Sequence, residues 1–191
     1  PNLDLPLDFD SLKKVGAMIG SGGLVVMDEN TCMVEVARFF MNFTQNESCG
    51  KCVPCREGTK RMLEILERIV AGNGQKGDVE LLLDLADTIS STALCGLGKT
   101  AAMPVVSTIK NFRSEYDAHI IDKKCPAGQC KKLVTYYIDP ELCKGCSKCA
   151  RNCPVEAISG EIQSPYKIDT SKCIKCGACV ENCNFGAVKE V

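Results

Sequence analysis

Aromatic side chains are scarce in this sequence of 191 residues, which has no tryptophan and only one histidine. Large aromatic residues usually supply much of the buried area of a core, so we expect something else to help organise the interior. The sequence also lacks any apolar run close to the roughly 20 residues that cross a bilayer, and no signal peptide is visible. We therefore expect neither a membrane span nor secretion.

An excess of one charge sign is also missing, since the formal net charge is −1. This balance does not indicate a general surface for nucleic acid or for a membrane, so we expect partners of neither kind. An initiator methionine is absent as well, because the sequence begins at Pro1. We therefore expect the chain to be a piece of a longer protein.

Cysteine, in contrast, is abundant, with 15 residues. Such a density is typical either of disulfide frameworks in secreted proteins or of metal sites. The count is odd and most of the cysteines are spaced Cys-x-x-Cys, which favours metal over disulfides. Free thiols persist in a reducing compartment, and we expect the protein to be cytoplasmic.

An internal repeat occupies the last third of the sequence. The segment YIDPELCKGCSKCARNCPVEAI (137–158) aligns with KIDTSKCIKCGACVENCNFGAV (167–188) at a shift of thirty positions. Each copy reads Cys-x-x-Cys-x-x-Cys-x-x-x-Cys. Three cysteines on one tight loop can hold three corners of a 4Fe–4S cluster, and in bacterial two-cluster ferredoxins the fourth ligates the partner cluster.

The repeat therefore predicts two cysteine sets that exchange their fourth members. The first set is Cys143, Cys146, Cys149 and Cys183. The second set is Cys173, Cys176, Cys179 and Cys153. Paired zinc knuckles would not need eight cysteines in this reciprocal arrangement. We expect residues 134–191 to form a small α+β domain like a bacterial two-4Fe–4S ferredoxin.

A helical segment precedes the repeat. Apolar periodicity predicts helices over about 32–43, 57–70, 78–92 and 103–116, and their short connections favour an antiparallel four-helix bundle. Asn30 or Thr31 is expected to cap the first of these helices. On the last three helices the predicted apolar faces include Leu66, Leu81 and Ile109, among others.

Four further cysteines belong to this helical segment: Cys49, Cys52, Cys55 and Cys95. Three of them are clustered just before the second helix and one follows the third helix, so together they can complete a four-thiolate site at one end of the bundle. Nearby cations, Lys51, Arg56 and Lys99, either offset the charge of such a site or are simply solvated.

Two motifs here resemble a known family. ESCGKCVPCREGT (47–59) and ALCGLGKTAAMP (93–104) look like the C-terminal part of the NADH-binding flavoprotein subunit of respiratory complex I and of related diaphorase subunits. The segment GAMIGSGGLVVMDENTCMVEVARFF (16–40) resembles the connection into that helical domain. The added ferredoxin extension is similar to the beta subunits of multimeric NAD-linked iron-only hydrogenases, including electron-bifurcating ones.

The resemblance implies that the four bundle cysteines hold a third 4Fe–4S cluster, which receives electrons from FMN. The FMN and NAD(H) pocket of this family lies upstream, and no such glycine-rich strand–loop–helix occurs here; we interpret GSGG (20–23) as a structural turn. We expect no catalytic residue in this chain. The implied partners are a hydrogenase catalytic subunit, a small 2Fe–2S subunit and an external ferredoxin.

Subtraction leaves three cysteines and the only histidine: Cys32, His119, Cys125 and Cys130. Three thiolates with one imidazole are an ordinary ligand set for structural zinc, and four is its usual coordination number. We expect zinc at this site, pinning an interdomain hinge from which the ferredoxin domain swings. A buried apolar role for Cys32, a Cys125–Cys130 disulfide and a 2Fe–2S centre with one histidine stand as alternatives.

The expected organisation is a connection from an upstream domain (1–29), an iron–sulfur bundle (30–117), a hinge (118–133) and a ferredoxin domain (134–191). The expected function is electron transfer in an oxidoreductase, as part of the diaphorase-like subunit of an NAD(P)-linked iron-only hydrogenase. An equivalent subunit of a formate dehydrogenase or of an NADH:quinone oxidoreductase is one alternative. A zinc-organised structural module without redox function is the alternative from another class.

Overall fold

The computed structural model describes residues 4–17, 20 and 22–190, and the chain divides into two units, residues 1–31 and 32–191. The described part of the first unit contains one short helix, α1 (Phe9–Lys14). The carboxylate of Asp8 caps it by accepting a hydrogen bond from the backbone N–H of Ser11, at 2.7 Å. The turn expected at GSGG lies partly outside the described residues; Gly20 and Gly22 both have positive φ.

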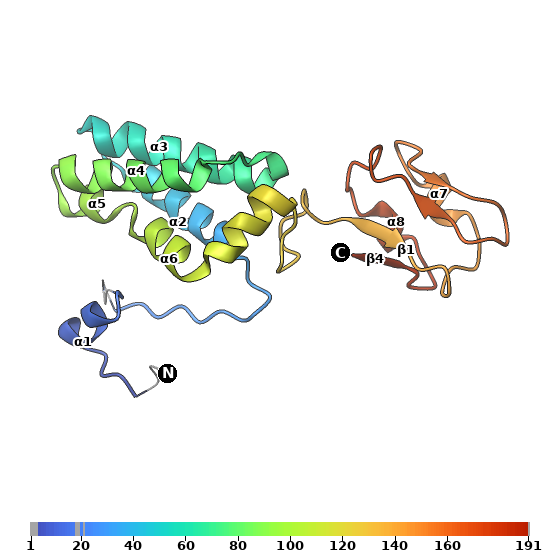
Figure 1. Cartoon of the computed structure of the whole chain (residues 1–191), viewed down its shortest axis with the longest axis horizontal. Coiled ribbons are helices and arrows are strands. Elements are labelled where there is room, and N and C mark those ends of the chain that lie inside the picture. Colours follow the sequence, from blue (N-terminus) through green and yellow to red (C-terminus); the bar gives the residue numbers. More distant parts are fainter. Residues whose placement is uncertain (1–3, 18–19, 21, 191) are drawn as a thin grey trace. The chain divides into compact units, whose positions relative to one another are not determined.

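The second unit begins with a helical bundle (Figure 1). Its four long helices are α2 (Met33–Glu47), α3 (Val53–Arg68), α4 (Asp78–Thr92) and α6 (Met103–Asp117). Shorter elements are η1 (Ile69–Asn73), α5 (Gly96–Thr100) and η2 (Ala118–Asp122). Helices α2 and α4 each contact both α3 and α6, so all four long helices surround one core, as the apolar periodicity predicts.

The bundle core is aliphatic and contains few aromatics. Its fully buried larger side chains include Met41, Met62, Leu66, Leu82 and Tyr116. Leu81, which the sequence pattern placed on the apolar face of α4, is 46% exposed, and the prediction for this residue was wrong. The face that α4 buries runs through Val79, Leu82, Ala86 and Ile89, at the i, i+3, i+4 spacing of a helix.

The start of α2 differs from the expected cap. Asn30 and Thr31 hydrogen-bond to the Asp28 side chain instead, and Cys32 occupies the N-cap position without a side-chain cap bond. The backbone N–H of Met33, at the first position of α2, donates to the carboxylate of Glu115 on α6, at 3.0 Å. A partner distant in sequence therefore caps this helix, which sequence-local capping rules do not reveal.

Residues 134–190 form two small antiparallel sheets and two short helices. In chain order the elements are β1 (Tyr136–Ile138), α7 (Lys148–Arg151), β2 (Ile158–Ser159), β3 (Lys167–Ile168), α8 (Ala178–Glu181) and β4 (Val188–Glu190). Strand β1 pairs with β4 and β2 pairs with β3. Each sheet joins the start of one sequence copy to the end of the other, so the two copies are interleaved.

Among the described residues, no helix is both long and apolar enough to cross a membrane.

Candidate functional site

The first predicted ferredoxin set lines one cavity. Cys143, Cys146, Cys149 and Cys183 all border a cavity of about 330 Å³, including space open to solvent. Cys143 and Cys146 belong to the loop before α7 and Cys149 lies in α7, whereas Cys183 follows α8 in the other sequence copy. The fold thus brings together residues separated by up to forty positions in the combination that the repeat predicts.

The second predicted set lines a second cavity, of about 320 Å³ including open space. Its four cysteines are Cys153, Cys173, Cys176 and Cys179. Each set therefore combines three thiols of one copy with one thiol of the other, and four cysteine thiolates around a cavity fit a 4Fe–4S cluster.

Backbone amides surround the fourth thiol of each cavity. The N–H of Ala187 donates to Cys183 Sγ and the N–H of Ala157 donates to Cys153 Sγ, both at 3.3 Å. Burial opposes the charge on Cys183, but backbone N–H groups of residues 185–188 outweigh it and lower the pKa of this thiol. For Cys179, burial dominates and raises the pKa to about 11. A cluster's positive irons would offset that burial cost.

The two cavities differ in the side chains that line them. Lys144 and Ser147 border the first cavity, and the equivalent positions of the second cavity hold Ile174 and Gly177. Clusters held in the two cavities would therefore meet different local charge and polarity, although their cysteine ligands are equivalent.

The bundle cysteines gather where α3 and α5 begin. Cys52 is the N-cap of α3 and Cys95 is the N-cap of α5. The backbone N–H of Leu94, next to Cys95, is the main cause that lowers the pKa of Cys52. A Cβ on Gly98 of α5 would clash with Ala93 Cβ at 2.7 Å and would lie in ordinary contact with Cys55 Sγ at 3.7 Å, so α5 packs closely against the start of α3. Cys52, Cys55 and Cys95 thus lie at the starts of these two helices and Cys49 lies in the loop before α3; four cysteines are the usual ligand set of a 4Fe–4S cluster.

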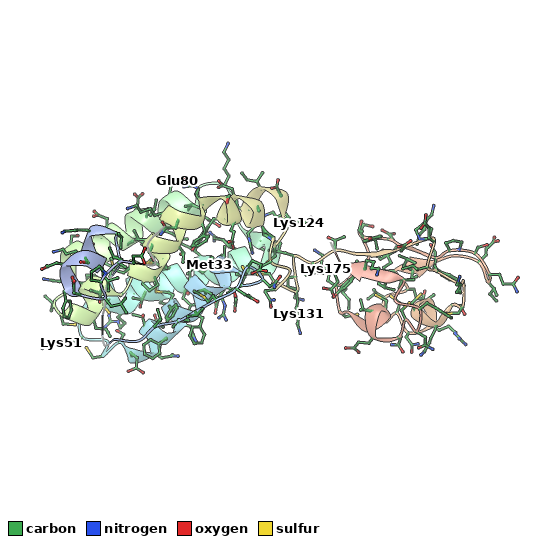
Figure 2. All side chains as sticks on the ribbon, turned by 90° about the horizontal axis from the view of Figure 1, so that it is seen from below. Met33, Lys51, Glu80, Lys124, Lys131 and Lys175 are labelled. Atoms are coloured by element: carbon green, nitrogen blue, oxygen red, sulfur yellow. The ribbon has the colours of Figure 1, made fainter. Side chains whose placement is uncertain are left out.

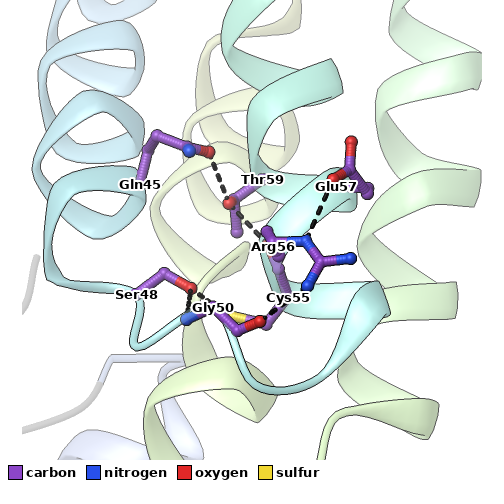
Figure 3. A network of polar contacts seen from close by, with 7 residues as sticks. All are labelled: Gln45, Ser48, Gly50, Cys55, Arg56, Glu57 and Thr59. Carbon is purple, nitrogen blue, oxygen red and sulfur yellow. Dashed lines mark hydrogen bonds and ion pairs between the residues drawn. The ribbon is translucent and has the colours of Figure 1, made fainter.

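Polar contacts hold the loop that carries these thiols (Figure 3). The Arg56 guanidinium donates to the Gly50 carbonyl at 2.9 Å and to Glu57 at 3.1 Å. Arg56 is therefore occupied by local partners, whereas Lys51 is exposed at this end of the bundle (Figure 2). The Ser48 hydroxyl lies 3.3 Å from Cys55 Sγ. Sequence reasoning did not single out Ser48, because no spacing rule connects it to Cys55.

The four residues left over by subtraction also meet. One ligand atom from each of Cys32, His119, Cys125 and Cys130 lies within 4.8 Å of the other three, and all four residues are buried. Cys32 Sγ is 3.7 Å from Cys130 Sγ and 3.3 Å from His119 Nε2, and this nitrogen is 3.4 Å from Cys130 Sγ. Thiolates 2.3 Å from a tetrahedral zinc lie about 3.8 Å apart, so the donor set fits zinc.

The orientation of His119 is fixed by its other ring nitrogen. Nδ1 lies 2.7 Å from the backbone carbonyl of Glu115, to which it donates, and this leaves Nε2 to face the thiols. Glu115 thus positions two of the four residues: its carbonyl orients His119, and its carboxylate accepts the N–H of Met33, next to Cys32. Sequence reasoning missed this positioning residue.

Electrostatics at this site favour a thiolate beside a cation. Hydrogen bonding from Cys130, with a further contribution from His119, lowers the pKa of Cys32 despite burial. The pKa of Cys130 is raised in turn, because it retains the proton that the pair shares. Burial works against a charged His119, but the hydrogen bond and charge of Cys32 outweigh it and raise its pKa. A bound metal cation would take the place of these protons.

All fifteen cysteines are free in the structure, so the Cys125–Cys130 disulfide alternative has no support in it.

Two family models match the chain. Residues 35–119 match the NADH-ubiquinone oxidoreductase-F iron–sulfur binding region, and residues 135–184 match the 4Fe-4S dicluster domain. The chain carries the iron–sulfur binding region of the oxidoreductase-F family, followed by a dicluster domain. Each model covers cysteines that the sequence analysis assigned to clusters.

Curated relatives match between about two thirds of the chain and most of it. The NADP-reducing hydrogenase subunit HndC of Solidesulfovibrio fructosivorans is 53% identical over 165 residues, which is 86% of this chain and 34% of that protein. An F-type NADH-quinone oxidoreductase protein of Rhizobium meliloti is 47% identical over 124 residues, 65% of this chain and 30% of that protein. The chain thus spans about a third of the length of these relatives.

A solved structure with similarity to the chain is an NAD+-reducing [NiFe]-hydrogenase in the H2-reduced state, with 34% identity and a TM-score of 0.48. The match covers 50% of this chain and 17% of that one.

Proposed function

We propose that the chain is the electron-transfer portion of the diaphorase-like subunit of an NAD(P)-linked iron-only hydrogenase. The observation that carries this proposal is the pair of cavities, each bordered by four cysteines contributed three and one by the two sequence copies. A hydrogenase subunit aligns with 86% of the chain, whereas the matched quinone oxidoreductase protein aligns with 65% of it. This difference favours a hydrogenase subunit over a quinone oxidoreductase subunit.

In this proposal the chain holds three 4Fe–4S clusters, which when bound accept and donate single electrons. Cys49, Cys52, Cys55 and Cys95 hold the bundle cluster. The ferredoxin clusters are held by the two cavity sets, in which Cys149 and Cys179 are buried and backbone amides donate to Cys153 and Cys183. FMN and NAD(H) belong to an upstream part of the longer protein, so this chain alone oxidises no NADH.

The fourth proposed group is a zinc ion at Cys32, His119, Cys125 and Cys130. Zinc has no accessible redox change, so its contribution is geometric. It ties the segment after α6 to the start of α2, and the exposed, lysine-rich sequence around it suits a hinge for the dicluster domain. Small-angle scattering that finds one fixed shape in every redox state would contradict the hinge.

Metal analysis tests the proposal directly. We expect about twelve irons and as many acid-labile sulfides per chain, one zinc, and three paramagnetic centres on reduction. Cys146→Ser should remove the iron of one cluster, and Cys32→Ser should leave the iron content unchanged but remove the zinc. A colourless protein that contains several zincs and no iron would exclude electron transfer and favour a structural module.

A further inference from the structure

The serine that ends α2 places its hydroxyl against a proposed cluster ligand. Ser48 is the C-cap of this helix, and its Oγ lies 3.3 Å from Cys55 Sγ (Figure 3). The backbone N–H of Gly50 points at the same oxygen, also at 3.3 Å. Three groups from the cysteine loop and its flanks therefore form one short chain of hydrogen bonds.

Which group donates and which accepts in these two hydrogen bonds follows from which groups carry a hydrogen atom. The Gly50 N–H can only donate, so the Ser48 oxygen accepts. A cluster-bound Cys55 is a thiolate and has no proton, so the Ser48 hydroxyl must be the donor in the second contact. The order of donation is Gly50 N–H to Ser48 Oγ, and Ser48 O–H to Cys55 Sγ.

We propose that Ser48 tunes the bundle 4Fe–4S cluster, raising its reduction potential by donating a hydrogen bond from its hydroxyl to the Cys55 thiolate. This inference rests on the proposed function. Reduction adds one negative charge to the cluster and its sulfurs, so a donor to sulfur stabilises the reduced state more than the oxidised state. Removal of the donor therefore shifts the equilibrium towards oxidation.

The surroundings keep the hydroxyl in place. Gly50 has φ of +70°, a conformation that favours glycine, and its carbonyl is fixed by Arg56 at 2.9 Å. The Thr59 hydroxyl bonds to Gln45 of α2 at 2.9 Å, which ties α3 to the helix that ends at Ser48. Cys55 itself is only 4% exposed, so little water competes for its sulfur.

The test compares Ser48→Ala with Ser48→Thr in the protein purified with its clusters. Potentiometric titration monitored by electron paramagnetic resonance should show that Ser48→Ala lowers the reduced-to-oxidised ratio of the bundle cluster about tenfold, or about 59 mV for one electron. Ser48→Thr keeps a hydroxyl and should retain the wild-type potential. The two ferredoxin clusters should be unchanged in both variants and serve as internal references.

Ser107→Ala is the matched control, because the Ser107 hydroxyl bonds to the Pro104 carbonyl within α6 and to no cysteine. An unshifted bundle potential in Ser48→Ala would overturn the inference and leave the proposed function intact. A Ser48→Ala protein that loses the cluster while Ser48→Thr keeps it would indicate an assembly role and would also overturn tuning. A wild-type protein without a reducible bundle cluster would instead refute the proposed function.

Discussion

His119 is the only imidazole of the chain and is fully buried among three thiols, with its ring orientation set by the Glu115 carbonyl. Loss of a residue that only hydrogen-bonds to a metal ligand typically lowers metal affinity by about tenfold or more. Because Nε2 of His119 is itself one of the four proposed zinc ligands, we expect His119→Ala to lower zinc affinity by at least about tenfold. Competition with a chromophoric chelator, followed by zinc analysis of the dialysed protein, measures this change.

Tyr116 provides the control for that substitution. It is also fully buried, but its hydroxyl bonds to Thr108 Oγ1 at 2.8 Å and it offers no ligand atom to the site. Tyr116→Phe should therefore keep the zinc and cost about 1 kcal/mol of stability through one lost hydrogen bond. Equal zinc loss in both variants would mean that packing, rather than ligation by His119, retains the metal.

At the scale of elements, the two cysteine loops (143–149 and 173–179) are equivalent by sequence, so a residue of one loop can be exchanged for its counterpart in the other. Lys144 borders the first cavity, and Ile174 stands at the equivalent position of the second. We expect Lys144→Ile to lower the potential of the first ferredoxin cluster and Ile174→Lys to raise that of the second. Lys144 is exposed, so the change in the reduced-to-oxidised ratio should be modest, roughly twofold to fivefold.

Redox titration of the two variants, each with the other ferredoxin cluster as its reference, checks this expectation. Lys175→Asn is the control, since the Lys175 ammonium donates to the Lys132 carbonyl and lines neither cavity, and asparagine tolerates the φ of +58° at this position. Shifts of the same sign in Lys144→Ile and Ile174→Lys would contradict the role of local charge.

The junction between α3 and α4 depends on a partly buried ion pair. The Asp78 side chain is 5% exposed, pairs with Arg68, which is 35% exposed, and accepts the N–H of Gln75 at 2.8 Å. Asp78→Ala removes the partner of this guanidinium and the acceptor of the Gln75 N–H and should destabilise the bundle by about 2 kcal/mol, measurable as a lower thermal midpoint. Glu80→Ala removes an exposed pair with Arg113 and should cost at most about 1 kcal/mol. Similar costs for both would contradict this distinction.

Sequence periodicity predicted the four long helices because each needs only one apolar face against a shared core. Periodicity did not predict where helices begin or how they are capped, because residues outside the periodic segment determine these features. Helix α3 begins at Val53 and not near residue 57, since Pro54 suits the first turn and Cys52 takes the N-cap position. The cap of α2 depends on Glu115 of α6, and the short helix α1 has too few residues to show a period.

At the scale of the whole molecule, counting cysteines predicted more of the site than local patterns could. The repeat assigned eight thiols and the family motifs four, so Cys32 and His119 were grouped by elimination although 87 positions separate them. The structure brings these two side chains to 3.3 Å, because α2 and α6 are neighbours in the bundle. Ser48 and Glu115 were not predictable in this way, since a hydroxyl and a carboxylate on helices have many ordinary uses.

The hinge proposal makes a prediction for the segment between the bundle and the dicluster domain. Lys124, Lys131 and Lys132 are exposed there, and they flank the buried thiols Cys125 and Cys130. Figure 2 shows Lys124 and Lys131 in this segment. A metal that ties these thiols to Cys32 restricts local opening, and a protease cuts at a rate set by such opening. Removal of zinc by His119→Ala should therefore accelerate tryptic cleavage at these lysines.

Mass spectrometry of a short digestion measures the effect, and the expected products are one fragment with the bundle and one with the dicluster domain. Cleavage after Lys60, within α3, provides the control site, because helix α3 holds no zinc ligand and should open no more often in the variant. Cleavage that rises equally at Lys60 and Lys131 would indicate general unfolding. A metal-pinned hinge requires faster cleavage at Lys124, Lys131 and Lys132 but not at Lys60. Wild-type protein should show the same change after chelation and lose it when zinc is restored.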